Sequence, residues 1–114
     1  MAGTLSRLKT KLRTGDTLER CGLVQRSGRI VEIENTHPNP EKGFVIPARE
    51  MIRLEKSVIA TWHTHPVGPA FLSEEDYNGF RQWPELRHYV VSPSGVTAYE
   101  VVDGLVLEVD LAAD

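Results

Sequence analysis

Two histidines at the end of an apolar run are the residues best suited to chemistry in this sequence. The run SVIATWHTH ends on His63 and His65. On an extended strand alternate side chains face the same way, so these imidazoles project from one face about 6.6 Å apart along the chain. They can converge on one metal ion, and imidazole is a suitable ligand for Zn²⁺.

A catalytic zinc site needs a third protein ligand and a vacant position for water. Asp76 is the best candidate, because PVGPAFL can turn the chain back and SEED can begin a helix whose first turn presents a carboxylate to the strand end. Zinc would lower the pKa of its bound water to about 7. The sequence therefore predicts one Zn²⁺ per chain, held by His63, His65 and Asp76.

The zinc-bound water would need a nearby proton acceptor. A carboxylate that does not bind the metal could take the proton and later pass it to a leaving amine. Spacing alone does not choose among the candidate carboxylates, which are Glu19, Glu32, Glu34 and Glu41.

Ser73 and Asp76 also fit a purely structural interpretation. A serine followed three residues later by an acid resembles a capping box, in which the acid reaches back to the amide of the cap residue. Both interpretations predict a helix start at Ser73 and differ in where the Asp76 carboxylate points. We expect zinc to prevail, because a divalent cation outweighs one amide dipole.

Cys21 is the single cysteine of the chain, so an intrachain disulfide is excluded and a reducing compartment is compatible. We expect a small buried residue, since nothing nearby in sequence marks the thiol as activated. A cysteine hydrolase is the alternative, which chelation and thiol alkylation would distinguish from metal chemistry. For His37 and His88 we expect surface or structural roles.

The elements that position these residues follow from the apolar pattern. Leucines at helical spacing predict a short amphipathic helix over residues 4–13. CGLVQRSGRIVEIEN predicts a hairpin with a tight turn, and THPNPEKG a loop. FVIPAREMIRLEK is predicted to begin as a short strand and become a brief helix with Pro47 in its first turn.

The second half of the chain predicts a strand, a helix and a β-meander. SVIATWHTH is the strongest strand candidate, and Ser73 opens the helix SEEDYNGFRQW. RHYVVS, VTAYEVV and LVLEVDL follow as three antiparallel strands. The fold class is α+β: a mixed, largely antiparallel curved sheet flanked by an N-terminal helix and a helix after the histidine motif. We expect one domain over residues 1–114.

Composition narrows the choice of partners. The chain has 40% hydrophobic and 25% charged residues, which is typical of a soluble globular protein. A formal net charge of −3 argues against nucleic acid as a partner. No apolar run is long enough to cross a bilayer, and the start lacks the features of a secretory signal. We therefore expect a cytoplasmic protein without membrane or nucleic-acid partners.

HTHPVGPAFLSEED resembles the signature of the JAMM metalloproteases of the MPN fold, also called the JAB domain. Its fixed positions are filled by His63, Thr64, His65, Pro66, Ser73 and Asp76. ERCGLV is similar to the glutamate element of that family, and ENTHPNPEKGFVIP resembles the stretch between the two motifs in prokaryotic members. The resemblance covers roughly residues 5–100 of a compact copy.

This resemblance implies a cytidine-deaminase-like α/β sandwich and a zinc-dependent peptidase or isopeptidase. The zinc ligands would be His63, His65 and Asp76, with Glu19 as general acid/base and Ser73 as hydrogen-bond donor to the oxyanion. The family hydrolyses amide or isopeptide bonds, often after the C-terminal tail of a ubiquitin-like or sulfur-carrier protein. The implied partner is a protein or peptide with an extended C-terminal tail, lying beside a strand edge.

Small phage-derived members of this family occur in tail assembly proteins, and the compact size and PSGVTAYEV ending resemble that branch. The alternative function is therefore a phage tail assembly or tail-tip component, structural or acting as a cell-wall peptidase. It would bind phage tail proteins and be virion-associated. Scaffolding members of the fold tend to lose metal ligands or the glutamate, so the full set here favours catalysis.

Overall fold

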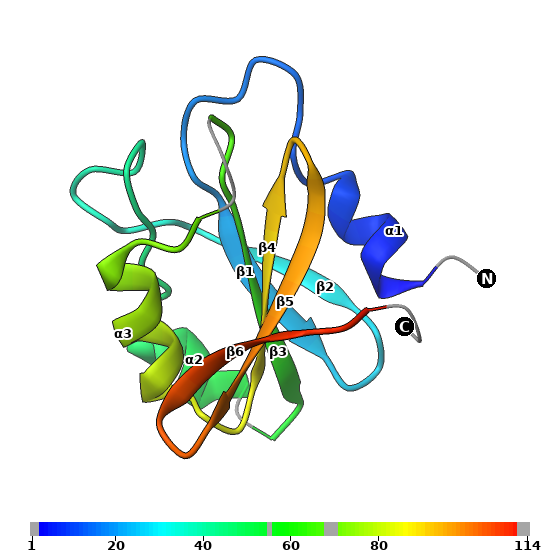
Figure 1. The fold of residues 1–114 in the computed structure, drawn as a ribbon, viewed down its shortest axis with the longest axis vertical. Coiled ribbons are helices and arrows are strands. Elements are labelled where there is room, and N and C mark those ends of the chain that lie inside the picture. Colours follow the sequence, from blue (N-terminus) through cyan, green and yellow to red (C-terminus); the bar gives the residue numbers. More distant parts are fainter. Residues whose placement is uncertain (1–2, 55, 68–70, 112–114) are drawn as a thin grey trace.

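A six-stranded mixed sheet with helices on both faces forms the protein (Figure 1). The computed structural model describes residues 3–54, 56–67 and 71–111. The strands, in chain order, are β1 (Cys21–Gln25), β2 (Ile30–Ile33), β3 (Val58–Thr64), β4 (Arg87–Ser92), β5 (Gly95–Val102) and β6 (Leu105–Val109). The helices are α1 (Thr4–Lys9), α2 (Ala48–Leu54) and α3 (Glu74–Gln82). The predicted α+β class is confirmed.

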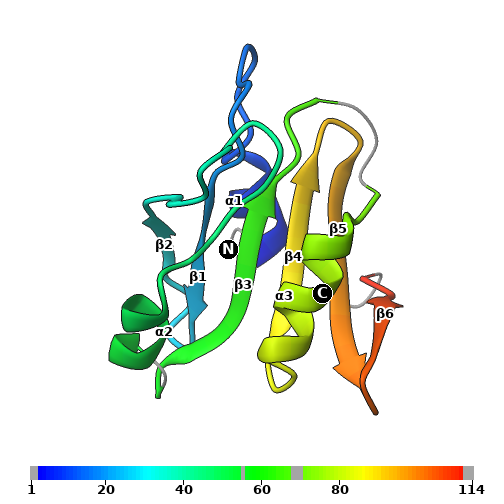
Figure 2. The same ribbon diagram turned by 90° about the vertical axis from the view of Figure 1, so that its left-hand side faces the viewer.

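The strand order is β2-β1-β3-β4-β5-β6, in which β3 and β4 run parallel and the other neighbours are antiparallel. A parallel pair cannot be closed by a tight turn and needs a crossover connection. The segment between β3 and β4, which contains α3, makes this crossover (Figure 2). The start of α3 is thereby brought to the carboxyl end of β3, where the two histidines lie.

Alternating side chains of the sheet build a core on each face. Figure 2 shows α1 on one face and α2 and α3 on the other. The core on the α1 face consists of Leu8, Val24, Ala60, Trp62, Tyr89, Val91 and Ala98. The core on the α2 face consists of Leu23, Ile33, Met51, Val58 and Leu86. Trp62 and His63 are neighbours in β3, so they point to opposite faces of the sheet.

Two sequence predictions are wrong in detail. The helix predicted over residues 4–13 ends at Lys9, where the Thr10 hydroxyl donates to the carbonyl of Arg7 at 2.7 Å. The strand predicted at FVIP does not form, because the Val45 amide donates to the Asn35 side chain at 2.9 Å. The predicted brief helix exists as α2 and begins directly after Pro47.

The remaining predicted elements are confirmed. The hairpin β1–β2 turns at Gly28, whose φ of 93° favours glycine. β4, β5 and β6 form the antiparallel meander, with positive φ at Asp103 and Gly104 in its second turn. Of the segment expected to turn the chain back after His65, residues 68–70 lie outside the described part of the chain.

His88 is a buried polar residue that ties α3 to the sheet. Its Nε2 must donate to the carbonyl of Trp83 at 3.1 Å, so its Nδ1 accepts from the Thr61 hydroxyl at 2.7 Å. The ring also stacks on Phe80 of α3 with centroids 4.4 Å apart. Burial lowers the pKa of His88 from 6.5 to about 4, which keeps the imidazole neutral. The expected structural role for this histidine fits these contacts.

We predict that His88 makes the protein less stable in mild acid. A histidine whose pKa is lower in the folded than in the unfolded protein contributes its full stabilisation to the fold at pH values above the unfolded pKa. That contribution is lost as the pH falls towards the folded pKa. Between about pH 7 and pH 4 the wild type should lose about 3 kcal/mol more unfolding free energy than His88→Gln. Urea unfolding of both proteins at several pH values measures the difference. Plots of unfolding free energy against pH that run parallel for the two proteins would contradict the prediction.

Candidate metal centre

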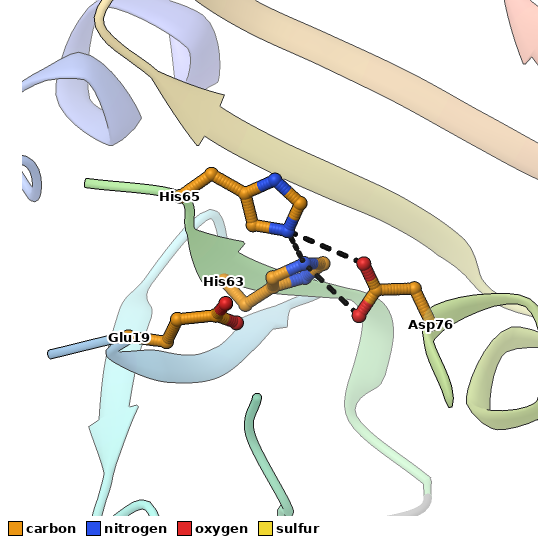
Figure 3. A group of neighbouring side chains, drawn as sticks. All are labelled: Glu19, His63, His65 and Asp76. Carbon is orange, nitrogen blue, oxygen red and sulfur yellow. Dashed lines mark hydrogen bonds and ion pairs between the residues drawn. The ribbon is translucent and has the colours of Figure 1, made fainter. Parts of the chain in front are cut away.

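Four side chains from three parts of the chain converge at the carboxyl end of β3 (Figure 3). His63 belongs to β3 and His65 follows its last residue, whereas Asp76 lies in the first turn of α3 and Glu19 precedes β1. One ligand atom from each of the four lies within 4.8 Å of all the others. The structure therefore brings together residues that lie up to 57 positions apart in the sequence (19 to 76).

The two histidines and the aspartate are spaced as ligands of one ion. Nε2 of His63 is 3.0 Å from Nε2 of His65 and 3.5 Å from Oδ1 of Asp76. Nε2 of His65 is 3.2 Å from Oδ2 of Asp76. Ligand atoms at tetrahedral angles and ordinary zinc distances stand about 3.4 Å apart. The observed triangle fits that arrangement, and these groups could hold a metal ion.

Asp76 makes the capping box and faces the histidines at the same time. Its Oδ2 accepts from the amide of Ser73 at 3.0 Å, while its own amide donates to Ser73 Oγ at 3.1 Å. The two interpretations of this motif are thus not exclusive, because the carboxylate has two oxygens with several lone pairs. The capping box thus holds the Asp76 carboxylate while it faces the two histidines.

Burial and the contacts among these side chains shift the pKa values of Asp76 and His63. Burial alone would raise the pKa of Asp76, but hydrogen bonds from His63 and His65 hold it well below its ordinary value. Burial lowers the pKa of His63, whose side chain is fully buried. The histidine is therefore favoured as a neutral base beside a carboxylate anion, which are the forms that bind metal.

Phe44 covers the ring of His63, with centroids 4.0 Å apart and an interplanar angle of 19°. No described residue binds Nδ1 of His63, although metal-binding histidines usually donate that second N–H to a partner. Stacking therefore orients this ring. Sequence reasoning missed Phe44 because it placed the residue in a strand.

Glu19 is nearly buried, with 9% of its surface exposed, and burial raises the pKa of its carboxyl group from 4.5 to about 7. No described residue binds its Oε1. A buried carboxylate oxygen without a protein partner fits a group that contacts water or a substrate. Figure 3 shows this carboxylate pointing towards the histidine pair.

The other carboxylates that spacing left open lie elsewhere. Glu32 forms an ion pair with Arg20 at 2.7 Å, Glu34 is exposed, and Glu41 is exposed at the rim of a small pocket beside Glu19. Among these four candidates, Glu19 is the member of the cluster of potential metal ligands. The fold therefore distinguishes Glu19 from the other three carboxylates, which spacing in the sequence could not do.

Thr64 fixes the segment that follows Glu19. Its amide donates to the carbonyl of Arg20 at 2.8 Å, and its hydroxyl accepts from the Arg20 amide at 2.8 Å. Thr64 is fully buried and points away from the face that carries the histidines. The residue between the two histidines therefore joins the segment of Glu19 to the end of β3.

Cys21 is fully buried in β1, and its thiol contacts the carbonyl of Ile33 at 3.6 Å. Burial raises the pKa of this thiol to about 12. A nucleophilic cysteine must form a thiolate near neutral pH and be reachable by its substrate. The cysteine-hydrolase alternative is therefore disfavoured, and the expected buried role is confirmed.

An apolar cavity of about 570 Å³ lies beside the site, between α3 and the chain before α2. We call it the α3 groove. Its walls include Phe44, Ile46, Met51, Phe80 and Trp83. Because Phe44 and Phe80 both lie against His63, the groove adjoins the site. Trp83 lines this groove, whereas Trp62 belongs to the core on the α1 face.

His37 connects the loop before α2 to α3. Its Nδ1 accepts from the Asn39 amide at 2.9 Å, so its Nε2 carries the hydrogen that binds Oε2 of Glu75 at the same distance. A Cβ at Gly43 would lie 2.8 Å from both of these side-chain atoms, so glycine permits the close approach. The sequence offered no signal for this pairing, since its partners lie 38 positions apart.

Fold and site together define a JAB-type domain. The family model for prokaryotic homologs of the JAB domain matches residues 1–102, and the chain belongs to this family. The resemblance found in the histidine motif is thereby confirmed. Membership favours a hydrolase, and the histidine–aspartate group is a possible metal site.

Two particular proteins are similar to the chain. A probable TtuB-protein conjugate cleaving protease from Thermus thermophilus is 26% identical over 83 residues, which cover 67% of this chain and 55% of that protein. The chain thus spans about half the length of this curated relative. A solution structure from Desulfitobacterium hafniense matches with a TM-score of 0.70 and 23% identity, covering 94% of this chain and 86% of that one. This second match shows the shared fold.

The structure and the comparisons bear on only part of the expected location and partners. None of the helices in the described part of the chain is long and apolar enough to cross a membrane. The Thermus relative is named for cleaving protein conjugates, which agrees with a protein substrate. A phage tail role gains no support from the family or from these two relatives.

Proposed function

We propose that this chain is a zinc-dependent peptidase or isopeptidase, with residues 1–114 forming its catalytic domain. His63, His65 and Asp76 hold one zinc ion, Glu19 carries the proton, and Ser73 binds the oxyanion. The observation that carries the proposal is the convergence of these ligand atoms and of Glu19 within 4.8 Å. Family membership and the conjugate-cleaving relative support the reaction class.

Zinc, when bound, would polarise the scissile carbonyl and lower the pKa of water. Glu19 takes one proton from the attacking water as oxygen bonds to the carbonyl carbon. It then gives that proton to the amine nitrogen as the carbon–nitrogen bond breaks. In the metal-free protein burial raises the pKa of this carboxyl group to about 7, which favours the protonated form that gives a proton to the amine, whereas a bound Zn²⁺ nearby would favour the carboxylate that accepts one from water.

Ser73 is suited to donate to the carbonyl oxygen while negative charge develops. Its Oγ already accepts from the Asp76 amide at 3.1 Å, so its hydroxyl hydrogen can point outward. Ser73, Glu19 and His65 line the same small pocket. A donor fixed before the reaction stabilises the oxyanion without reorganising during it.

The substrate that we propose is a protein with an extended C-terminal tail, of the ubiquitin-like or sulfur-carrier kind. The α3 groove beside His63 offers apolar walls for the residues that precede the scissile bond. Phe44 and Phe80 narrow the approach to His63, which favours small residues such as glycine next to that bond.

A ubiquitin-like protein joined through its C-terminal carboxyl group to a fluorescent amine tests this function. We expect amide hydrolysis by the zinc-loaded protein, loss of hydrolysis after chelation, and recovery when zinc is restored. Iodoacetamide should have no effect, because Cys21 is buried. Hydrolysis that resists chelation but stops on alkylation would contradict the proposal.

A further inference from the structure

Asn35 lies outside the metal centre, yet its side chain is fully hydrogen-bonded. Its Nδ2 donates to the carbonyls of Glu19 at 2.8 Å and Gly43 at 3.0 Å. Its Oδ1 accepts from the amides of His37 at 3.1 Å and Val45 at 2.9 Å. Both donor hydrogens and both acceptor positions of the amide are used, so its orientation is fixed.

The backbone of Glu19 is held by the loop of residues 35–45, to which Asn35 belongs. Its carbonyl binds Asn35, and its amide donates to the carbonyl of Pro40 at 2.7 Å. Glu19 precedes β1, so it has no partner in the sheet ladder. No described residue binds Oε1 of its carboxylate. The position of this carboxylate therefore depends on how the Glu19 backbone is held.

The same loop, residues 35–45, is attached to the other side of the site. His37 binds Glu75 of α3 at 2.9 Å, and Glu75 directly precedes Asp76. Gly43 packs where a larger residue would collide with this pair. Loop 35–45 thus joins the segment of Glu19 to the helix that carries Asp76, and Asn35 holds the two ends of the loop together.

We propose that Asn35 is a positioning residue, which holds Glu19 at the distance from the metal ligands that proton transfer requires. The inference rests on the function proposed above. Loss of the Asn35 amide group frees the Glu19 carbonyl and lets the carboxylate leave the site. The metal ligands lie on β3, just beyond it, and on α3, so metal binding is retained.

Asn35→Asp is the variant that tests the proposal. It keeps the acceptor oxygen and the shape but loses both donor hydrogens and sets an oxygen against two carbonyls. Asn39→Asp is the matched control, because it adds the same charge to the same loop and the Asn39 side chain binds no described residue. Asn35→Ala serves as a second variant without added charge.

Amide hydrogen exchange of the zinc-free proteins, measured by NMR, gives the first readout. We expect the Glu19 amide to exchange at least about 10-fold faster in Asn35→Asp than in the wild type or Asn39→Asp, with β3 unchanged. Unchanged protection of Glu19 would overturn the proposal. Loss of protection throughout β3 would also overturn it, since Asn35 would then support the fold in general.

Turnover of the fluorescent ubiquitin-like amide gives the second readout. We expect kcat to fall about 10- to 100-fold in Asn35→Asp, with KM and zinc affinity unchanged. The loss should vanish in a Glu19→Gln background, because Asn35 acts through Glu19. A loss that persists there would overturn the proposal. If the zinc-loaded wild type hydrolyses no amide, the proposed function fails, while exchange still decides whether Asn35 holds Glu19.

Discussion

Glu19→Gln is expected to lose about 10²- to 10⁴-fold in kcat while one zinc ion stays bound per chain. Glutamine has nearly the same shape but cannot accept the proton from water at neutral pH. His63, His65 and Asp76 form their triangle without Glu19, so zinc affinity should not fall. Steady-state turnover with metal analysis of the same samples measures both quantities.

The same substitution should stabilise the zinc-free protein at high pH. The folded pKa of Glu19 lies near 7, above its ordinary 4.5, so the folded state binds the proton more tightly. The contribution of Glu19 to the free energy of unfolding is fully present below about pH 4.5 and is lost as pH rises through 7. At about pH 8, Glu19→Gln should exceed the wild type by about 3 kcal/mol in unfolding free energy.

Glu34→Gln is the matched control for Glu19→Gln, because Glu34 is exposed at the end of β2. It should change neither turnover nor the pH dependence of stability. Full activity of Glu19→Gln would remove this residue as the proton carrier. Equal stability of Glu19→Gln and wild type across the pH range would show that burial does not raise its pKa.

Asp76→Ala is expected to weaken zinc binding by more than about 100-fold and to abolish turnover. Replacing a residue that only supports a ligand already costs 10- to 100-fold, so removing a ligand should cost more. The carboxylate also accepts from the Ser73 amide, so the variant should lose about 1 kcal/mol of folding stability. Competition with a chromophoric chelator and thermal unfolding measure these effects.

Two further variants separate the roles of Asp76. Asp76→Asn keeps an acceptor for the Ser73 amide but loses the anionic ligand, so it should regain stability without regaining tight zinc binding. Glu74→Ala removes an exposed acid from the same turn of α3 and should bind zinc like the wild type. Tight zinc binding by Asp76→Ala would show that the ion lies elsewhere.

The half of the site that contains the histidines could be predicted because its signals are local. Alternation in β3 predicted the shared face of His63 and His65, and the capping box predicted the helix start that presents Asp76. Strand alternation and the capping box thus indicate where these three side chains point. The remaining step, bringing α3 to the end of β3, follows from the crossover that a parallel pair requires.

The half that contains Glu19 could not be derived from spacing. Its place in the site depends on the pairing of β1 with β3, in which Cys21 lies opposite His63. Family resemblance pointed to Glu19, but alternation and turn signals do not specify which distant strands pair. Phe44 was misplaced for a related reason. Its β-like sequence predicted a strand, whereas the Asn35 side chain organises that segment by donating to the carbonyl of Gly43 and accepting from the amide of Val45.

X-ray absorption at the zinc edge tests the central claim most directly. The zinc-loaded protein should show two imidazole nitrogens and two oxygen ligands, one from Asp76 and one from solvent, at about 2.0–2.2 Å. The imidazole signal should fall to one in His63→Ala if any zinc is retained. A sulfur ligand, or a spectrum that does not change in His63→Ala, would contradict a site formed by His63, His65 and Asp76.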